Sequence, residues 1–449
     1  MSTQSTQSTQ STEAVYTTPD ASKDIETVEE LFSHLYDASR VEMQSIPMYL
    51  YAGYSIQTQN SSRWAAGVGA FRLIKSVVIE EMLHLALTRN LIISIGYGDR
   101  IQFSDPGFIP AYPCDMLHRN PEDPLKLHLA PLTPKLVKDV FMKFEQPAKK
   151  GSPPQSKNYD SLGQFYRAIY DGFIRLSGIL DTDIGAEFGT EVAPEKRFRF
   201  DATWMNDLFK NNKPELQYVE TYWNEGGGGS PIVVHNLKTA LDAINTIVEQ
   251  GEGMDDDRQV VPKKPADPQP GEFELPHYVK FKRIADQWEP IGNIHPLPTD
   301  PRIAAYPEED GIRDLAELCN AAYVYTLRLL DEIYRTPWDD VKPGKRSPRY
   351  GLERKFIAAM QGLLFGCVRE LVQTKITSGA YEGRNAAPTF EYYEFPEGED
   401  MTEHLKDMCQ DVITDFPRLG GDNGVLWLID KMPSLEPLIP LPAIPKARV

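Results

Sequence analysis

The 449-residue sequence has few cysteines and no long apolar run. Its four cysteines lie far apart and form no CxxC pair: Cys114, Cys319, Cys367 and Cys409. This spacing argues against zinc knuckles and a disulfide framework, and it suits a reducing compartment, so we expect a cytoplasmic protein. No run of about 18 apolar residues is present, and the sequence therefore predicts no membrane-spanning helix.

Positive charge is also scarce. Lys and Arg total 47 against 65 Asp and Glu, which gives a formal net charge of −18. Such an acidic chain is poorly suited to nucleic acid or to an anionic membrane surface, so we expect a small-molecule substrate; the composition leaves a homo-oligomer open. The sequence has no Gly-x-Gly-x-x-Gly motif, and no Gly-Lys-Ser/Thr follows the glycines at 226–229, so nucleotide-binding folds are not supported.

Apolar residues recur at helical spacing along most of the chain, and we find no convincing set of strands. Residues 1–23 are rich in Ser, Thr and Gln without the apolar core of a signal peptide, and they predict a disordered tail. Helices predicted at 314–334, 354–376 and 403–416 show only core packing. The fold class is therefore predicted to be all-α.

The first helix carries a glutamate where an apolar residue is expected. Thr27 and Glu30 form a capping-box pattern, which predicts that the helix begins after Thr27. Pro47 should kink it. The inner face, at steps of three and four, is Leu31, Leu35, Ala38, Glu42, Ser45 and Tyr49. Glu42 thus lies on the buried face, unless it sits at a frayed or partly exposed edge.

The second helix, predicted at 63–95 and ended by Gly96, repeats this feature. Glu81 occupies a core position among Gly67, Phe71, Ile74, Val78, Leu85, Thr88, Ile92 and Ile95. His84, three residues later, shares its face, because residues three apart on a helix are neighbours. A buried glutamate needs a partner, a proton or a metal ion. Glu80 points about a third of a turn away, so it either supports the site from outside or is solvated.

Two further helices carry candidate ligands. In the helix predicted at 234–251, the stripe Leu237, Leu241, Ile244 and Val248 continues in phase to Glu252. Glu249 lies about 100° off that stripe and is the fallback. The alternative is that Glu252 belongs to an acidic loop.

A second Glu-x-x-His follows at Glu274–His277. His277 lies on an apolar face with Phe281 and Ile284. Pro276 fits only the first turn of a helix, so Glu274 is near the N-cap, where it could merely cap the helix.

Together these helices present Glu, Glu-x-x-His, Glu and Glu-x-x-His in chain order. Ferritin-like di-iron and di-manganese proteins bind two metal ions with this donor set. Four carboxylates can neutralise and bridge two divalent ions, and the imidazoles leave positions for dioxygen and substrate. The predicted metal ligands are Glu42, Glu81, His84, Glu252, Glu274 and His277.

Several motifs carry a family resemblance: Val41–Leu50, Glu80–His84, Ser161–Ile169, Ile247–Gly253 and Glu274–Phe281. Over residues 25–290 the chain resembles the ferritin-like domain of the iminophenyl-pyruvate dimer synthase family, and 387–391 extends the similarity more loosely. Larger synthases of that family oxidatively couple two tryptophan-derived imines in violacein- and rebeccamycin-type pathways. The resemblance implies a ferritin-like four-helix bundle, and oxidative imine coupling as one reaction to test.

We therefore expect a metal-binding bundle over 24–300, with a long crossover insertion at 97–230. A C-terminal helical extension at 301–449 packs on it. The predicted function is a non-haem di-iron oxidase or oxygenase for a small organic substrate derived from an amino acid or another secondary metabolite. It uses two iron ions, with manganese as the alternative, and dioxygen as co-substrate. The alternatives are a ferroxidase or iron-binding protein, and a metal-free helical partner of a biosynthetic enzyme.

Overall fold

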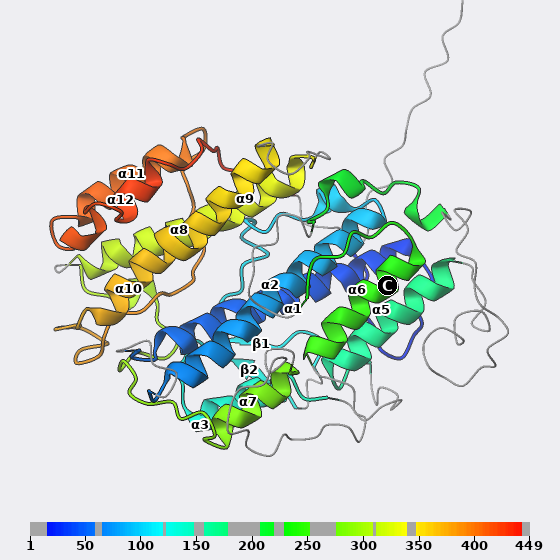
Figure 1. The fold of residues 1–449 in the computed structure, drawn as a ribbon, viewed down its shortest axis with the longest axis horizontal. Helices are drawn as coiled ribbons and strands as arrows, with labels where there is room; N and C mark the ends of the chain where they lie inside the picture. Colours follow the sequence, from blue (N-terminus) through cyan, green and yellow to red (C-terminus); the bar gives the residue numbers. More distant parts are fainter. Residues whose placement is uncertain are drawn as a thin grey trace, which may run out of the picture.

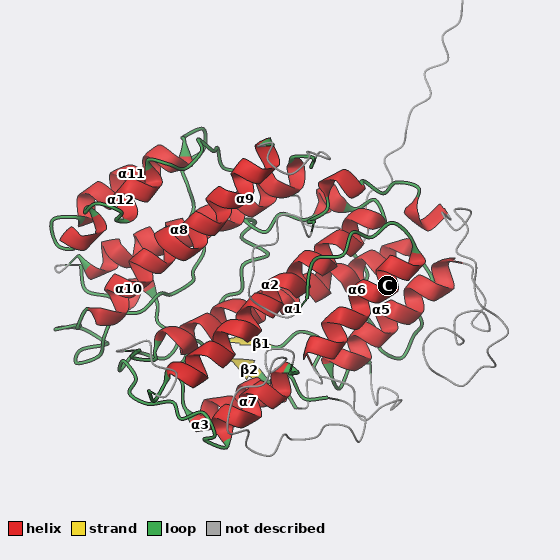
Figure 2. Ribbon diagram, viewed as in Figure 1, coloured by secondary structure: helices red, strands yellow, loops and turns green. Residues whose placement is uncertain are grey.

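The protein is built almost entirely from helices, as predicted (Figure 2). The computed structural model describes residues 16–58, 65–119, 123–147, 157–177, 207–219, 229–251, 275–308, 311–338 and 347–441. The predicted disordered tail lies mostly outside them, since the description begins at Tyr16. The described strands are β1 (Cys114–Asp115) and β2 (Lys126–Leu127), which form one short antiparallel pair.

Two long helices, α1 (Val28–Tyr54) and α2 (Val68–Ser94), pack along each other through the centre of the molecule (Figure 1). The predicted capping box at Thr27 and Glu30 is present, with the Glu30 amide donating to Thr27 Oγ1 at 3.1 Å. Helix α1 continues through Pro47. Almost the whole of α1 is buried between its neighbours, so burial extends well beyond the predicted inner face.

Helix α2 begins five residues later than predicted. Gly67, which we placed on the inner stripe, instead precedes the helix in the left-handed conformation with φ 90°. Its amide donates to the Pro290 carbonyl at 2.9 Å, and a Cβ there would meet the Ile291 carbonyl oxygen at 2.8 Å. The close passage of the 290–292 segment thus fixes the start of α2, and helical periodicity does not encode this contact.

Helices α5 (Leu162–Ser177) and α6 (Leu237–Gly251) complete the bundle. Helix α5, from within the predicted crossover, packs on α1 and α6, and α6 packs on α2. On another side of the α1–α2 pair, α7 (His277–Ala285) lies against an interrupted helix (Figure 1). That helix consists of α3 (Pro134–Leu136), the π-helical segment η2 (Val137–Phe141) and α4 (Met142–Phe144).

The C-terminal helices gather beside the end of α1. They are α8 (Ile312–Arg335), α9 (Pro348–Ala358), the π-helical segment η10 (Ala359–Leu364), α10 (Phe365–Gln373), α11 (Met401–Val412) and α12 (Val425–Ile429). Helix α10 packs on α1, where the Tyr54 and Phe365 rings lie 5.8 Å apart. The buried Asp331 carboxylate accepts hydrogen bonds from the backbone amides of Phe103 and Ser104. The α8 layer is thereby joined to the segment that follows α2.

One described stretch, Pro348–Gln373, is long and apolar enough to cross a membrane by length and composition alone. Half of its most apolar window is buried inside the protein. Core helices of soluble proteins pass the same test, so this stretch is weak evidence for a membrane span.

Candidate metal centre

Buried carboxylates and imidazoles converge where α1, α2, α4 and α7 meet. Glu42 comes from the middle of α1, and Glu81 and His84 come from α2. Glu145 directly follows α4, and His277 is the first residue of α7. Their donor atoms form two groups that could each hold a metal ion, and both groups contain Glu81. We call Glu42, Glu81 and His84 the outer position, and Glu81, Glu145 and His277 the inner position.

Glu81 lies between the two imidazoles and presents one oxygen to each. Its Oε1 is 3.0 Å from His277 Nδ1, and its Oε2 is 3.7 Å from His84 Nδ1. The two imidazole rings lie 5.4 Å apart and are nearly parallel. A carboxylate with one oxygen toward each of two ligand groups has the arrangement needed to bridge two metal ions.

Each imidazole is held in place by a hydrogen bond from its Nε2 atom, on the side away from Glu81. His84 Nε2 is 3.0 Å from Gln250 Oε1 on α6, and His277 Nε2 is 2.8 Å from Glu80 Oε2. Since both partner atoms are acceptors, each Nε2 carries the proton, and in the neutral ring Nδ1 carries a lone pair. Both Nδ1 atoms therefore face carboxylate oxygens.

The Nδ1 atom of His277 is buried and makes no hydrogen bond to any described residue. It nevertheless lies 3.0 Å from Glu81 Oε1 and 3.5 Å from Glu145 Oε1. A lone pair facing carboxylate oxygens in a buried site is repulsive unless a cation lies between them. That cation is either a proton or a metal ion, so the residues present fit a bound metal.

In the metal-free protein, protons lie between the carboxylate oxygens and the imidazole nitrogens. Burial raises the pKa of Glu42 to about 8, and the nearby Glu81 carboxylate adds to the effect. Burial alone would lower the pKa of His84, but hydrogen bonding to Glu42 and Glu81 outweighs it and raises the pKa to about 9. Burial also opposes charge on His277, yet Glu145 and Glu81 raise its pKa well above the ordinary value. A metal ion would have to displace these protons.

Two tyrosines orient the carboxylates. The Tyr166 hydroxyl, on α5, donates a hydrogen bond to Glu42 Oε1, and the Tyr49 hydroxyl, on α1, donates to Glu145 Oε1 at 2.6 Å. Burial, together with these carboxylates, raises the pKa of both phenols well above the ordinary value. Both tyrosines therefore stay protonated as hydrogen-bond donors.

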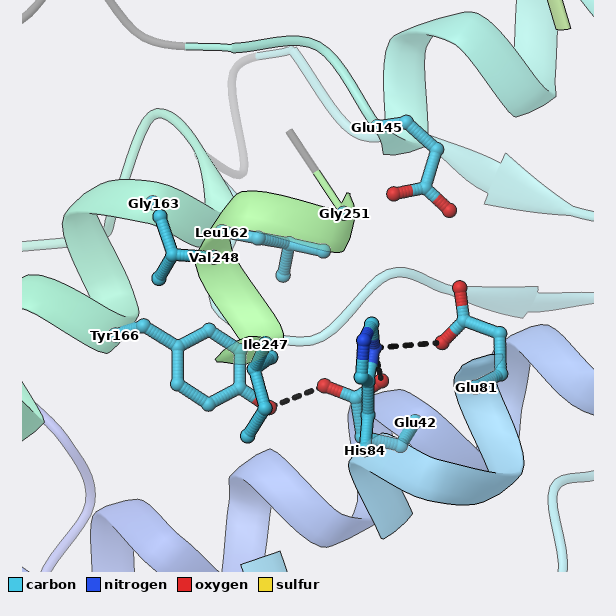
Figure 3. Close-up of a pocket in the computed structure, with 10 residues that line it drawn as sticks. All are labelled: Glu42, Glu81, His84, Glu145, Leu162, Gly163, Tyr166, Ile247, Val248 and Gly251. Carbon is cyan, nitrogen blue, oxygen red and sulfur yellow. Dashed lines mark hydrogen bonds and ion pairs between the residues drawn. The ribbon is translucent and has the colours of Figure 1, made fainter. Parts of the chain in front are cut away.

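A hollow of about 270 Å³, which includes space open to solvent, reaches the outer position (Figure 3). Its floor contains Glu42, Glu81 and His84, with the Glu145 carboxylate pointing in from α4 (Figure 3). Its walls come from α5 and α6: Leu162, Gly163, Tyr166, Ile247, Val248 and Gly251. His277 does not line the hollow. All three ligands of the outer position thus line the hollow, but only two of the three inner ligands do.

Four of the six predicted ligands lie together: Glu42, Glu81, His84 and His277. Glu252 and Glu274 lie outside the described residues. Gly251, which precedes Glu252, lines the hollow, whereas the fallback Glu249 is exposed.

Helix α7 begins only at His277 with Pro276 as its N-cap. His277 is therefore the first helical residue of α7, and Glu274 lies outside the described residues.

Glu145 was missed by the sequence analysis. It stands four residues after Phe141 and eight after Val137, both fully buried, so it shares the misplaced-glutamate signal that drew attention to Glu42 and Glu81. The sequence analysis placed this segment in the predicted crossover at 97–230 and assigned it no ligand. The π-helical segment η2 precedes it, and such segments are frequent at functional sites.

Comparison with known proteins supports the same fold. A ferritin-like family model matches residues 35–286, which is more than half of the chain. The chain belongs to the ferritin-like family. Its fold is also similar to the crystal structure of a ferritin-like protein from Caulobacter vibrioides, with a TM-score of 0.51 and 20% sequence identity over 82% of this chain and 99% of that chain. The search of curated proteins found no match.

The ferritin-like superfamily includes di-iron oxidoreductases as well as iron-storage proteins that are not enzymes. Membership therefore agrees with the two carboxylate and histidine groups but leaves the reaction open. The predicted domain limits and the narrower synthase family stay predictions.

Proposed function

We propose that the protein is a non-haem dimetal oxidase or oxygenase that uses dioxygen to oxidise a small organic substrate. The metal ligands would be Glu42, Glu81, His84, Glu145 and His277, with Glu252 and Glu274 as further predicted ligands. Two iron ions are the proposed metal pair, with manganese as the alternative, because carboxylate and imidazole donors suit both. The site would then combine open coordination positions with an apolar approach.

The observation that carries the proposal is the buried Nδ1 of His277. It makes no hydrogen bond to any described residue, yet it lies close to carboxylate oxygens of Glu81 and Glu145. Structural histidines in protein cores usually satisfy both ring nitrogens by hydrogen bonds. Here one nitrogen is satisfied by Glu80 and the other faces two carboxylates. This arrangement is expected of a metal ligand whose outward N–H is held in place.

When bound, a pair of redox-active metal ions would activate dioxygen and accept electrons from the substrate. The chain's own residues hold the site ready for that chemistry. Glu81 keeps one oxygen toward each imidazole, and Glu80 and Gln250 keep the Nε2 proton on His277 and His84. The Tyr166 hydroxyl donates to Glu42 Oε1 and leaves Oε2 facing His84. The Tyr49 hydroxyl donates to Glu145 Oε1, the oxygen that also lies 3.5 Å from His277 Nδ1, and so holds that carboxylate in place.

The walls of the hollow support an organic substrate. Leu162, Ile247 and Val248 are apolar, and pockets for organic ligands are lined mainly by such residues. The resemblance to imine-coupling synthases makes an amino-acid-derived imine the first substrate class to test. The two other apolar residues near the opening, Gly163 and Gly251, leave space beside the outer position.

One observation favours iron oxidation without an organic substrate as the second candidate. The enclosed part of the hollow has room for about one water molecule. An organic substrate therefore reaches the outer position only if the ends of α5 and α6 separate. Iron and dioxygen need no such opening.

The test is anaerobic reconstitution with Fe²⁺, followed by metal analysis, and then exposure to oxygen with and without amino-acid-derived imines. We expect two metal ions per chain, and oxygen uptake that depends on the organic substrate. Glu81→Ala should abolish most metal binding, because Glu81 serves both positions. Glu353→Gln, at a buried glutamate paired with Arg349 in α9, is the matched control and should bind metal normally.

The outcomes separate the candidates. Oxygen uptake with iron alone and no organic turnover would leave a ferroxidase. Protein without bound iron or manganese would leave the metal-free partner of a biosynthetic enzyme. Glu81→Ala with unchanged metal content would overturn the proposed site.

A further inference from the structure

The two metal positions differ in how their histidines are supported. His84 Nε2 donates to the neutral amide oxygen of Gln250, a partly exposed residue. His277 Nε2 donates to the carboxylate of Glu80, which is almost completely buried. A carboxylate behind a histidine raises the basicity of its metal-binding nitrogen more than an amide does.

Glu80 is itself held by a second buried charge. The Lys280 ammonium, one helical turn after His277 and fully buried, donates to the same Oε2 that accepts from His277. These three residues link α2 to α7. Because the ammonium and the carboxylate cancel in charge, the pair fixes His277 without adding net charge to the site.

Burial further favours the inner position. Glu80, Lys280 and His277 are each at most 1% exposed, so little rotamer entropy remains to be lost when a metal binds. His84 lines the hollow, whereas His277 does not, and Gln250, which supports His84 from the end of α6, is partly exposed. The support of His277 is therefore better preorganised than that of His84.

We propose that the Glu80–Lys280 pair is a positioning element that makes the inner position the tighter, first-filled metal site. The outer position, next to the hollow, is the weaker and exchangeable one. This inference rests on the proposed dimetal centre and adds an order of loading to it. Glu80 and Lys280 act through His277 and are not themselves ligands.

The experiment is an anaerobic calorimetric titration of the full-length protein with Fe²⁺, repeated with Mn²⁺. We expect two steps of unequal affinity in the wild type. His277→Ala should remove the tighter step, and His84→Ala the weaker one. Circular dichroism before each titration checks that the variant is folded.

Two substitutions test the cause of the difference in affinity between the two metal positions. Glu80→Gln gives His277 the kind of neutral partner that His84 has, so the tighter step should weaken roughly 10–100-fold and approach the weaker one. Gln250→Glu gives His84 a carboxylate partner, so the weaker step should tighten. Gln250 is partly exposed, which makes this variant the safer one for folding. Glu353→Gln, a neutralised buried glutamate far from the centre, should leave both steps unchanged.

The outcomes distinguish this inference from the function on which it rests. Wild-type protein that binds no metal overturns the dimetal proposal and this inference with it. Two bound metals with loss of the tighter step in His84→Ala, or unequal steps that Glu80→Gln and Gln250→Glu leave unchanged, overturn the order of loading alone.

Discussion

Glu42→Gln should stabilise the metal-free protein and remove the stabilisation that metal provides at the outer position. Glu42 is buried beside Glu81, and its pKa is raised from 4.5 to about 8 by burial and by the Glu81 charge. A raised carboxyl pKa means that folding disfavours the ionised form. The free-energy cost of folding with this carboxyl is absent below pH 4.5, grows as the pH rises, and is complete above pH 8. Glutamine carries no charge but keeps an oxygen that can accept from Tyr166.

The size of the effect at pH 7 follows from the pKa. The unfolded carboxyl is ionised there, and 7 − 4.5 = 2.5 pH units correspond to about 3 kcal/mol at 1.36 kcal/mol per unit. The Glu42 carboxylate also supports protonated His84, and this support is lost in the variant. We therefore expect metal-free Glu42→Gln to be about 1–3 kcal/mol more stable, with Tm raised by a few degrees.

Metal at the outer position should offset this difference between the two proteins. A ligand at 100 times its Kd stabilises a folded protein by about 2.7 kcal/mol, and only the wild type keeps the outer position intact. The assay is thermal unfolding, followed by circular dichroism, after chelation and again after anaerobic addition of Mn²⁺.

Glu353→Gln is the control, since its stability relative to the wild type should be the same with and without metal. If metal-free Glu42→Gln is less stable than the wild type and both gain equally from metal, Glu42 is a structural ion-pair partner and our reasoning is refuted.

Other predictions test neighbouring features. Glu145→Gln should lower the metal content from two ions to one, measured by metal analysis, and an unchanged content would exclude Glu145 as a ligand. Gly67→Ala should lower the free energy of unfolding by more than about 2 kcal/mol, because of the φ of 90° and the close Ile291 carbonyl. Gly351 has open space around it, so Gly351→Ala should raise the free energy of unfolding by about 0.5–1 kcal/mol. Burial lowers the pKa of His34 from 6.5 to about 4, so stability should fall by up to about 3 kcal/mol between pH 6.5 and pH 4. His34→Gln should lose this dependence in urea titrations across that range.

Much of the fold could be predicted because apolar residues recur at helical spacing along the long helices. The stripes of α1 and α2 revealed their polar exceptions, Glu42, Glu81 and His84, before any contact between the helices was known. The capping box at Thr27 located the start of α1. These signals are local, and each lies within a few turns of one helix.

What the sequence could not provide depends on contacts between distant segments. Glu80 seemed to point away from the centre, yet it is buried because Lys280, 200 residues later, lies against it. Glu145 follows an interrupted helix, so its stripe is short and ends at the glutamate itself. Helix α2 begins later than predicted, after Gly67, because another segment passes close to that residue. Periodicity does not encode the contacts of Glu80 and Gly67, and it carries only a short signal for Glu145.

The charges of the described residues indicate why the remaining predicted ligands matter. Glu42, Glu81 and Glu145 bring three negative charges into a buried space, while Glu80 and Lys280 cancel each other. One divalent ion would leave a net charge of −1, and two would leave +1. Two ions thus call for one further anion, since an uncompensated buried charge is costly. Glu252 and Glu274 are the chain's own candidates for that anion. The pKa of Glu42, raised to about 8, agrees with this need, because it means that the metal-free site disfavours an ionised carboxylate.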